Sequence, residues 1–234
     1  MPVAILFIGN TGAGKSALLS LLGGEFKSGV KCRKGYTKDI YEKNVVIEGK
    51  PFVLIDAPGL FEPQPKETEK NVMKLTEALG RGYSYLLYFV LKANNRGPTD
   101  EDMVMMSKVN ECVRQAGSKA IFRVIINQIQ DKQVYDMYEE FVARDNCETL
   151  FQDMKMEGFS FDIMVSHVLL FRFDEAAING NSDKEVPGEN QIKHQLREDI
   201  LIHYSSPALL EKPINATNGD ISTFLKALLA MGLG

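Results

Sequence analysis

The stretch 9–16, which reads GNTGAGKS, constrains the fold of this chain more than any other feature. It matches the pattern G-x-x-x-x-G-K-[ST], with both glycines, the lysine and the hydroxyl in register. Six apolar residues precede it at 3–8, and helix-forming residues follow it from Ala17 to Leu22, ahead of two glycines. A buried strand, a glycine-rich loop and a helix in this order predict a phosphate-binding loop rather than an ordinary turn.

The residue types in this loop suit phosphate chemistry. Glycines allow consecutive backbone N–H groups to face phosphate oxygens, and the N-terminus of the following helix favours an anion. We expect Lys15 to reach the β- and γ-phosphates and Ser16 to ligate Mg²⁺. The loop residues predicted to contact the nucleotide are Asn10, Thr11, Gly12, Ala13, Gly14, Lys15, Ser16 and Ala17.

Composition is that of a globular protein with one α/β domain. Charged residues make up 25% of the 234 residues, hydrophobic ones 44%, and the formal net charge is −4. This acidic balance argues against a general nucleic-acid binder, so we expect no nucleic-acid partner. Three widely spaced cysteines indicate neither a disulfide framework nor a zinc site. Because no apolar run is long enough for a transmembrane anchor and no signal peptide is recognisable, we expect a cytoplasmic protein.

The spacing of apolar segments predicts the fold class. Runs of β type recur, with helical patterns between most of them, at 3–8, 45–48, 51–56, 83–91, 120–127 and 163–171. This alternation is typical of an α/β P-loop NTPase with a mainly parallel central sheet and helices on both faces. In VVIEGKPFVLID, only a tight turn around Gly49 and Lys50 separates two runs, so this pair must form an antiparallel edge hairpin. Such a hairpin favours a switch GTPase over a kinase-like P-loop enzyme.

Further helical patterns predict how the rest of the chain is organised. They lie at 99–117, 132–154, 190–204 and 219–231. At the start of the first, Thr99 and Asp102 resemble a capping box. We expect a nucleotide-binding domain over 1–180 and a C-terminal helical extension over 181–234 that packs on the same domain. The alternatives for the last, apolar helix are that it covers the neighbouring helix or a partner, or that it makes a peripheral membrane contact.

A second nucleotide signature follows the hairpin, in LIDAPGLF. Asp56 ends a buried run and Gly59 comes three residues later. An aspartate there can reach Mg²⁺, usually through water, and the glycine N–H can donate to a γ-phosphate. The best candidate for the hydroxyl that completes the metal shell is Thr37, 21 residues after Ser16. The predicted Mg²⁺ site therefore consists of Ser16, Thr37 and Asp56.

Three segments together resemble the GIMAP family, septin-like GTPases that include avirulence-induced plant proteins. They read GNTGAGKSALLSLLGG, GYTKDIYEKNVVIEGKPFVLIDAPGLFEP and NNRGPTDEDMVMMSKVNECVRQAG. In the third, residues 98–102 occupy the place of a family box that reads roughly G-R-[FY]-T-x-E-D. The likeness covers about 1–131 well and the remainder less clearly. It implies that the chain binds GTP or GDP with Mg²⁺.

The resemblance also implies where the base is recognised. Relatives carry N-K-x-D, or a [TN]-x-x-D variant, on the loop after the fifth strand, whereas this chain reads INQIQDK. Asn127 fits, but Gln130 replaces the aspartate that accepts two hydrogen bonds from guanine. Guanine discrimination should therefore weaken unless Gln128 or Asp131 substitutes. The residues expected at the base are Asn127, Gln128, Gln130, Asp131, Phe171 and Arg172, although a core role is commoner for a strand-end phenylalanine.

Hydrolysis requires a group that this sequence lacks at its usual place. Leu60 follows Gly59 where many switch GTPases carry a glutamine that orients the attacking water, so an isolated monomer should hydrolyse GTP slowly. The resemblance implies that a nucleotide-dependent homodimer supplies an arginine in trans. That position aligns with Gly97, and we hypothesise that the neighbouring Arg96 acts as the finger. The residues predicted to act in catalysis are Lys15, Thr37, Gly59 and Arg96.

Three functions follow, in order of preference. The first is a guanine-nucleotide switch that dimerises on GTP across the nucleotide face and hydrolyses it slowly. The second is a nucleotide-dependent scaffold with negligible hydrolysis, which the replacement at Leu60 keeps open. The third is an ATP-using P-loop enzyme, which only Gln130 supports.

Overall fold

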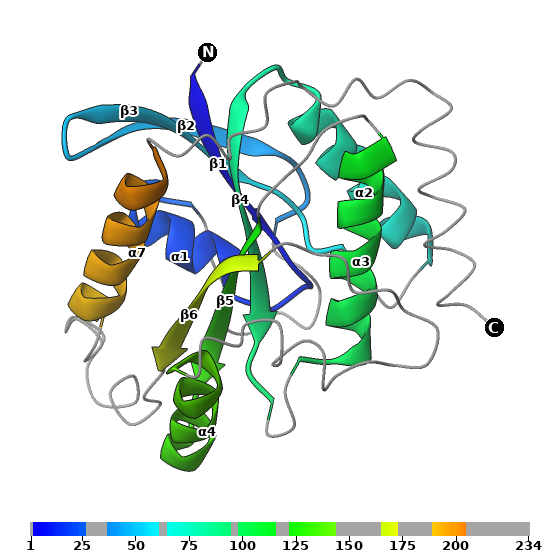
Figure 1. The fold of residues 1–234 in the computed structure, drawn as a ribbon. Coiled ribbons are helices and arrows are strands. Elements are labelled where there is room, and N and C mark those ends of the chain that lie inside the picture. Colours follow the sequence, from blue (N-terminus) through cyan, green and yellow to red (C-terminus); the bar gives the residue numbers. More distant parts are fainter. Residues whose placement is uncertain are drawn as a thin grey trace.

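The computed structural model (Figure 1) describes residues 2–26, 37–60, 65–94, 98–115, 122–143, 165–172 and 189–204. Within them, one six-stranded sheet has the strand order β2-β3-β1-β4-β5-β6. Its strands are β1 (Val3–Ile8), β2 (Tyr41–Ile47), β3 (Lys50–Asp56), β4 (Ser84–Lys92), β5 (Phe122–Ile129) and β6 (Val165–Arg172). The helices are α1 (Lys15–Leu21), α2 (Pro65–Leu79), α3 (Asp100–Gln115), α4 (Lys132–Ala143) and α7 (Glu189–Tyr204). The predicted α/β class with a mainly parallel sheet is confirmed.

The β2–β3 pair is antiparallel and lies at the edge of the sheet, as predicted. Ile47 pairs with Lys50, so the turn consists of Glu48 and Gly49, one residue earlier than expected. Their φ angles are 46° and 76°, and positive φ at both positions is the requirement of a two-residue type I′ turn. β2 also begins before its apolar run, at Tyr41, because this half of the edge strand is largely exposed and needs no apolar side chains.

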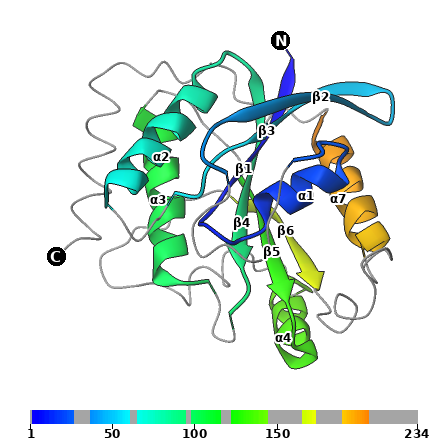
Figure 2. The same ribbon diagram turned by 180° about the vertical axis from the view of Figure 1, so that it is seen from behind.

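Two hydrophobic cores cover the two faces of the sheet. Along β1 the side chains alternate between them: Leu6 lies in one core, and its neighbours Ile5 and Phe7 lie in the other. Helices α2, α3 and α4 cover the first face, and α1 and α7 cover the second (Figure 1, and Figure 2 from behind). Because both faces are covered, β1 is apolar and buried along its whole length.

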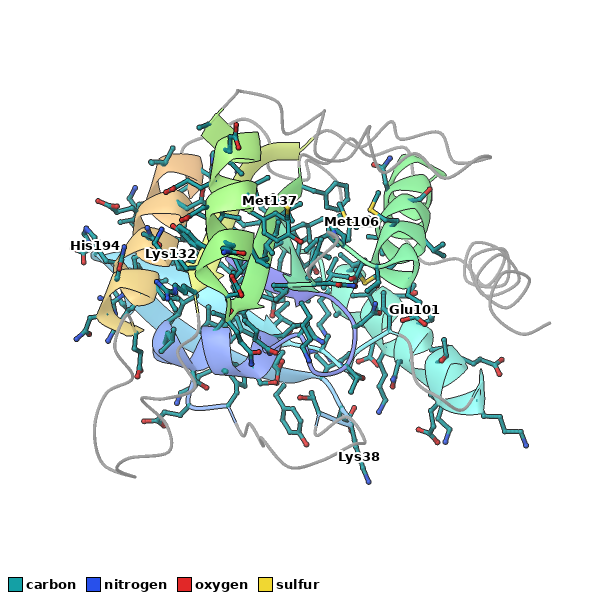
Figure 3. All side chains as sticks on the ribbon, turned by 90° about the horizontal axis from the view of Figure 1, so that it is seen from below. Lys38, Glu101, Met106, Lys132, Met137 and His194 are labelled. Atoms are coloured by element: carbon teal, nitrogen blue, oxygen red, sulfur yellow. The ribbon has the colours of Figure 1, made fainter. Side chains whose placement is uncertain are left out.

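Helix α3 begins with the capping box that was predicted. The Thr99 hydroxyl oxygen accepts from the Asp102 N–H at 3.2 Å. In return, Asp102 Oδ2 accepts from the Thr99 N–H at 3.2 Å and from the Thr99 hydroxyl at 2.8 Å. The methionines of α3, Met103, Met105 and Met106, are buried in the core, and Figure 3 shows Met106 on the inner side of the helix.

Helices α4 and α7 start within one residue of the predicted positions, whereas no pattern had been assigned to α2. α4 begins at Lys132 and α7 covers 189–204. The rest of the second pattern, 144–154, and the helix expected at 219–231 lie outside the described residues. The division at residue 180 therefore stays a prediction. Among the described residues, no helix is both long and apolar enough to cross a membrane.

A buried polar cluster fixes α7 to the sheet. The Tyr88 hydroxyl on β4 donates to Asp199 Oδ2 on α7 at 2.6 Å, and Arg123 Nε on β5 lies 3.7 Å from the same oxygen. Burial raises the pKa of Tyr88 well above its usual range and lowers the pKa of Arg123. One turn further along α7, His203 Nε2 lies 3.3 Å from Asp199 Oδ1. These contacts join the helix to the middle of the sheet.

Candidate nucleotide-binding site

The predicted phosphate-binding loop connects β1 to α1 at the carboxyl end of the parallel strands. Gly9 passes so close to β4 that a Cβ there would lie 2.2 Å from the Val90 carbonyl oxygen. Gly14, the N-cap of α1, has a φ of 92°, and a Cβ there would lie 2.5 Å from Asn127 Nδ2. Both positions therefore require glycine, which is the physical reason for the two fixed glycines of the pattern.

Lys15, the first residue of α1, is buried beside this loop. Its Nζ donates to the carbonyl oxygens of Gly9 at 3.0 Å and Asn10 at 3.1 Å. The ammonium group is thus held next to backbone N–H groups at a helix N-terminus, where an anion is favoured. Thr11 and Gly12 continue the loop, and Ala17 is exposed on the first turn of α1.

The three residues predicted to bind Mg²⁺ come together at one point. Ser16 Oγ donates to Asp56 Oδ2 at 2.7 Å, and Thr37 Oγ1 donates to the same oxygen at 3.1 Å. The two hydroxyl oxygens are 3.0 Å apart. The three side chains come from the start of α1, the segment before β2 and the end of β3, so the site joins three separate parts of the chain.

The surroundings of Asp56 fit a divalent cation. Its side chain is 2% exposed, and its Oδ1 has no hydrogen-bond partner among the described residues. Burial raises the pKa of Asp56. The Ser16 hydrogen bond, the Lys15 charge and the Thr37 hydrogen bond lower this pKa to a smaller extent. Carboxylate and hydroxyl oxygens are the hard ligands that Mg²⁺ prefers, and the ion would neutralise charge on bound phosphates.

Gly59 lies against the phosphate-binding loop. A Cβ at this position would lie 2.5 Å from the Thr11 backbone nitrogen and 2.7 Å from its Cα, so only glycine fits. The Gly59 carbonyl accepts from Asn71 Nδ2 at 2.7 Å, and the next N–H, that of Leu60, donates to the Gly9 carbonyl at 3.3 Å. The residue predicted to sense the γ-phosphate is thus in contact with the loop that would hold it.

The Leu60 side chain is turned away from the site. It is 1% exposed and belongs to the core that α2 and α3 cover. A buried aliphatic side chain cannot orient a water molecule, so the position after Gly59 contributes no polar side chain to hydrolysis.

Asn10 joins the phosphate-binding loop to α3 by a contact that the sequence did not indicate. Its Nδ2 donates to Asp102 Oδ1 at 2.8 Å, and Asp102 is 3% exposed. Burial raises the pKa of Asp102, and its hydrogen bonds from Thr99 and Asn10 lower it less. The capping-box pattern located Asp102 at the helix start, but no local signal pairs it with a residue 92 positions earlier.

The predicted base residues on β5 are tied to the phosphate-binding loop. Asn127 Nδ2 donates to the Ala13 carbonyl at 2.9 Å, and Gln128 Nε2 donates to the Gly12 carbonyl at 2.8 Å. Gln128 has a φ of 63°, a left-handed conformation that few residues other than glycine adopt. The two amides thus fix the end of β5 beside the phosphate site.

A pocket of about 360 Å³ opens beside these residues. Its volume lies within the range of about 300–1,000 Å³ that is usual for ligand sites. It is lined by Ala93, Asn94, Gln128, Gln130, Asp131 and Val134. Asp131 Oδ1 accepts from the N–H groups of Gln133 at 2.6 Å and Val134 at 3.3 Å, so this carboxylate caps α4. Three predicted base residues therefore share one pocket, and the Asp131 carboxylate among them is engaged in a helix cap.

The other predicted site residues are placed differently. Phe171 is 1% exposed and packs in the core that α1 and α7 cover, so its side chain has the core role and does not face a base. Arg172 is exposed at the end of β6. Arg96 and Gly97 lie outside the described residues.

Comparison with known proteins shows the family. A sequence model of the family described as 50S ribosome-binding GTPase matches residues 4–141, more than half of the chain. The chain belongs to this GTPase family. It is therefore a GTP-binding GTPase domain, and its cofactors are GTP or GDP and Mg²⁺.

Curated relatives of this GTPase are longer proteins. GTPase Der of Thermosipho melanesiensis is 28% identical over 167 residues, which are 70% of this chain and 36% of Der. The tRNA modification GTPase MnmE of Exiguobacterium sibiricum is 33% identical over 199 residues, 83% of this chain and 40% of MnmE. The chain thus spans less than half the length of either relative.

Solved structures of similar fold include GTPases of the chloroplast translocon. Toc33 from Arabidopsis thaliana, in complex with GDP and Mg²⁺, matches with a TM-score of 0.54 and 15% identity, over 90% of this chain and 87% of Toc33. A second structure matches with a TM-score of 0.57 and 16% identity, over 90% of this chain and 87% of that one. It belongs to work on the translocon components atToc33 and psToc159, for whose GTPase activity dimerisation is important. At such identities the likeness shows the fold alone.

Proposed function

We propose that this GTPase is a guanine-nucleotide switch that binds GTP with Mg²⁺, forms a homodimer across the nucleotide face and hydrolyses GTP slowly. The observation that carries the proposal is the meeting of Ser16, Thr37 and Asp56, with both hydroxyls on one carboxylate oxygen. Thr37 comes from a separate segment before β2, and its hydroxyl meets α1 at Ser16. A metal and a γ-phosphate would therefore change how that segment is held, which is the physical basis of a switch.

Slow hydrolysis follows from the burial of Leu60. No side chain at this position can orient water, so the missing group must come from elsewhere for turnover to be fast. The dimerisation on which atToc33 and psToc159 depend for GTPase activity supports a partner subunit as the source. We propose that this chain is of the GIMAP type and that Arg96 is the group that acts in trans.

The direct test is phosphate release measured over a hundredfold range of protein concentration, with dimerisation followed in parallel by analytical ultracentrifugation. The switch requires that turnover per subunit rises with concentration and that a non-hydrolysable GTP analogue, but not GDP, favours the dimer. An effective finger contributes about 10³- to 10⁵-fold in rate, so Arg96→Ala should remove nearly all of the rise. Unchanged turnover in Arg96→Ala at high concentration would exclude the finger role.

A nucleotide-dependent scaffold is the second candidate, and the buried Leu60 is the observation that favours it. A scaffold would dimerise on the GTP analogue in the same experiment while releasing no phosphate above the uncatalysed rate at any concentration. The two functions thus give opposite results in one assay.

The proposal also covers where the protein is located in the cell and whether it binds nucleic acid. We propose a cytoplasmic protein that binds no nucleic acid, supported by the formal net charge of −4. An electrophoretic mobility assay with single- and double-stranded RNA at low salt tests this, because non-specific binding by a basic face is strongest there.

A further inference from the structure

Helix α2 carries two side chains that bond to two different segments of the nucleotide site. Asn71 Nδ2 donates to the Gly59 carbonyl at 2.7 Å. Lys74 Nζ donates to the Lys38 carbonyl and lies 3.5 Å from Asp39 Oδ1. Positions three apart lie on the same face of a helix, so Asn71 and Lys74 act from one rigid surface. We call this pair the α2 clamp.

The Asn71 contact fixes the peptide that follows the metal carboxylate. Asn71 is 7% exposed and its hydrogen bond is buried, so losing it would leave the Gly59 carbonyl without this partner. On the other side of the same peptide, the Leu60 N–H donates to the Gly9 carbonyl. The backbone of Gly59 is therefore held between α2 and the phosphate-binding loop.

The Lys74 contact fixes the segment that supplies the metal hydroxyl. Lys38 directly follows Thr37, whose hydroxyl bonds to Asp56. The Lys38 side chain points away from the body of the molecule (Figure 3), and Lys74 bonds its backbone carbonyl instead. The ion pair with Asp39 is largely exposed and contributes little by itself, so the carbonyl contact is the important one.

We infer that the α2 clamp makes the metal-binding segment at Thr37 and the phosphate-sensing segment at Gly59 respond together. Asn71 and Lys74 are positioning residues in this account, since neither belongs to the proposed metal or phosphate contacts. The inference rests on the proposed switch function and adds the element that couples its two halves. Since α2 is one helix, a ligand that orders either segment lowers the cost of ordering the other, which is a coupling between metal and γ-phosphate.

The experiment measures affinities for a non-hydrolysable GTP analogue with Mg²⁺ and for GDP in chelator, in Asn71→Ala, Lys74→Met and the double variant. Asn71→Ala should lower the affinity for the analogue about fivefold or more, because the buried hydrogen bond to the Gly59 carbonyl is lost. Lys74→Met should lower it less, because the Lys74 contact with the Lys38 carbonyl is exposed. Affinity for GDP in chelator should stay within about twofold. The double variant should lose less affinity for the analogue than the product of the two single losses, as expected for residues in one network.

Matched variants separate positioning from general stability. Lys70→Met removes an exposed lysine one turn earlier on α2, paired with Glu67 at 3.0 Å, and should leave every affinity unchanged. Lys74→Arg keeps a cationic donor and should restore the Lys74→Met loss. Asn71→Leu, of nearly the same volume but without a donor, replaces Asn71→Ala if thermal melting shows that variant to be unfolded.

Two results would overturn the inference, and they differ from failure of the switch. Losses that multiply in the double variant, or equal losses for the analogue and GDP, would show that Asn71 and Lys74 act independently or only on stability. If the unaltered protein binds both nucleotides equally and without regard to Mg²⁺, the switch itself is wrong and the clamp with it.

Discussion

The predicted phosphate end and the predicted base end of the site are built in different ways. At the phosphate end, Lys15 and Asp56 are buried and charged, and hydroxyls from two other segments converge on one carboxylate oxygen. At the base end, amide side chains line an open pocket, and the carboxylate of Asp131 caps a helix. One end holds desolvated charges in fixed positions, and the other presents neutral groups beside solvent.

This difference separates affinity from selectivity. Charged groups taken out of water interact strongly with phosphate and metal, whatever base the nucleotide carries. Neutral amides offer both a donor and an acceptor, so they distinguish guanine, which presents two donors, less well than a free carboxylate does. We therefore expect changes at the phosphate end to affect all nucleotides alike and changes at the base end to alter their ratio.

The largest expected effect is that of Lys15→Met. Removing one partner of a buried, charge-assisted contact costs about 2–5 kcal/mol, which corresponds to a loss of about 30-fold or more. Calorimetric titration should show this loss for GDP and ADP equally. Lys132→Met is the control, since that exposed lysine only pairs with Asp136 at 2.6 Å. A loss of affinity for GDP but not for ADP would contradict the view that the phosphate end binds all nucleotides alike.

Asp56→Asn should remove most of the Mg²⁺ dependence of nucleotide binding. A carboxylate that holds a metal through water typically contributes about 10- to 100-fold in metal affinity. The amide oxygen can still accept from Ser16 and Thr37, so the fold is retained. Titration of nucleotide with and without Mg²⁺ measures the change. Equal Mg²⁺ dependence in both proteins would place the ion elsewhere.

The same substitution should change how the stability of the nucleotide-free protein depends on pH. Burial raises the pKa of Asp56, so the folded state holds this proton more tightly than the unfolded chain, where the value is near 3.8. The contribution of Asp56 to the free energy of unfolding is therefore lost as pH rises from its pKa in the unfolded chain to its pKa in the folded protein. Asp56→Asn should melt at a higher temperature than the unaltered protein at pH 7, and the difference should close as pH falls toward about 4. A difference that does not vary with pH would contradict this.

Gln130→Asp should sharpen base selectivity. A carboxylate can accept both donors of guanine, and hydrogen bonds to charged groups contribute about 1.5–3 kcal/mol each, so the GDP-to-ADP affinity ratio should rise about 10- to 100-fold. Gln133→Asp adds the same charge three residues further along and should leave the ratio unchanged. If the unaltered protein already prefers GDP strongly and Gln130→Asp adds nothing, the base is recognised by other groups.

Asp131→Ala should have the smallest effect, and on stability alone. Loss of a helix N-cap costs about 0.5–2 kcal/mol, which urea unfolding can measure, while the GDP-to-ADP ratio stays the same. Asp136→Ala, which removes only an exposed partner of Lys132, should cost less. A fall in GDP affinity without a fall in stability would make Asp131 a base-recognising residue.

Local patterns were sufficient to predict the fold. The order of strands and helices follows from apolar periodicity, and the edge hairpin follows from a loop too short for a crossover. The phosphate-binding loop and the capping box at Thr99 were predictable for the same reason, because each is a contact between residues close in sequence. The sequence also brought Ser16, Thr37 and Asp56 into one predicted site, and the structure places their side chains together. Their role as metal ligands stays a prediction.

Contacts between residues far apart in the chain could not be predicted from the sequence. The Asn10–Asp102 and Asn71–Gly59 hydrogen bonds depend on how helices are rotated against the sheet, which short-range patterns do not determine. Asp131 was named, with Gln128, as a residue that could substitute for the aspartate missing at position 130. Its place just before α4 could have indicated a helix cap. Phe171 was assigned to the base although its apolar neighbours on β6 also fit the core.

The buried cluster around Asp199 has a consequence for how the protein is made. Synthesis proceeds from the N-terminus, so Tyr88 and Arg123 leave the ribosome well before the carboxylate that they contact. Until α7 follows, its part of this apolar face stays uncovered and the Arg123 guanidinium lacks the Asp199 carboxylate. The predicted phosphate and metal residues have all been synthesised by residue 59, yet this face of the sheet is complete only when residues 189–204 have emerged.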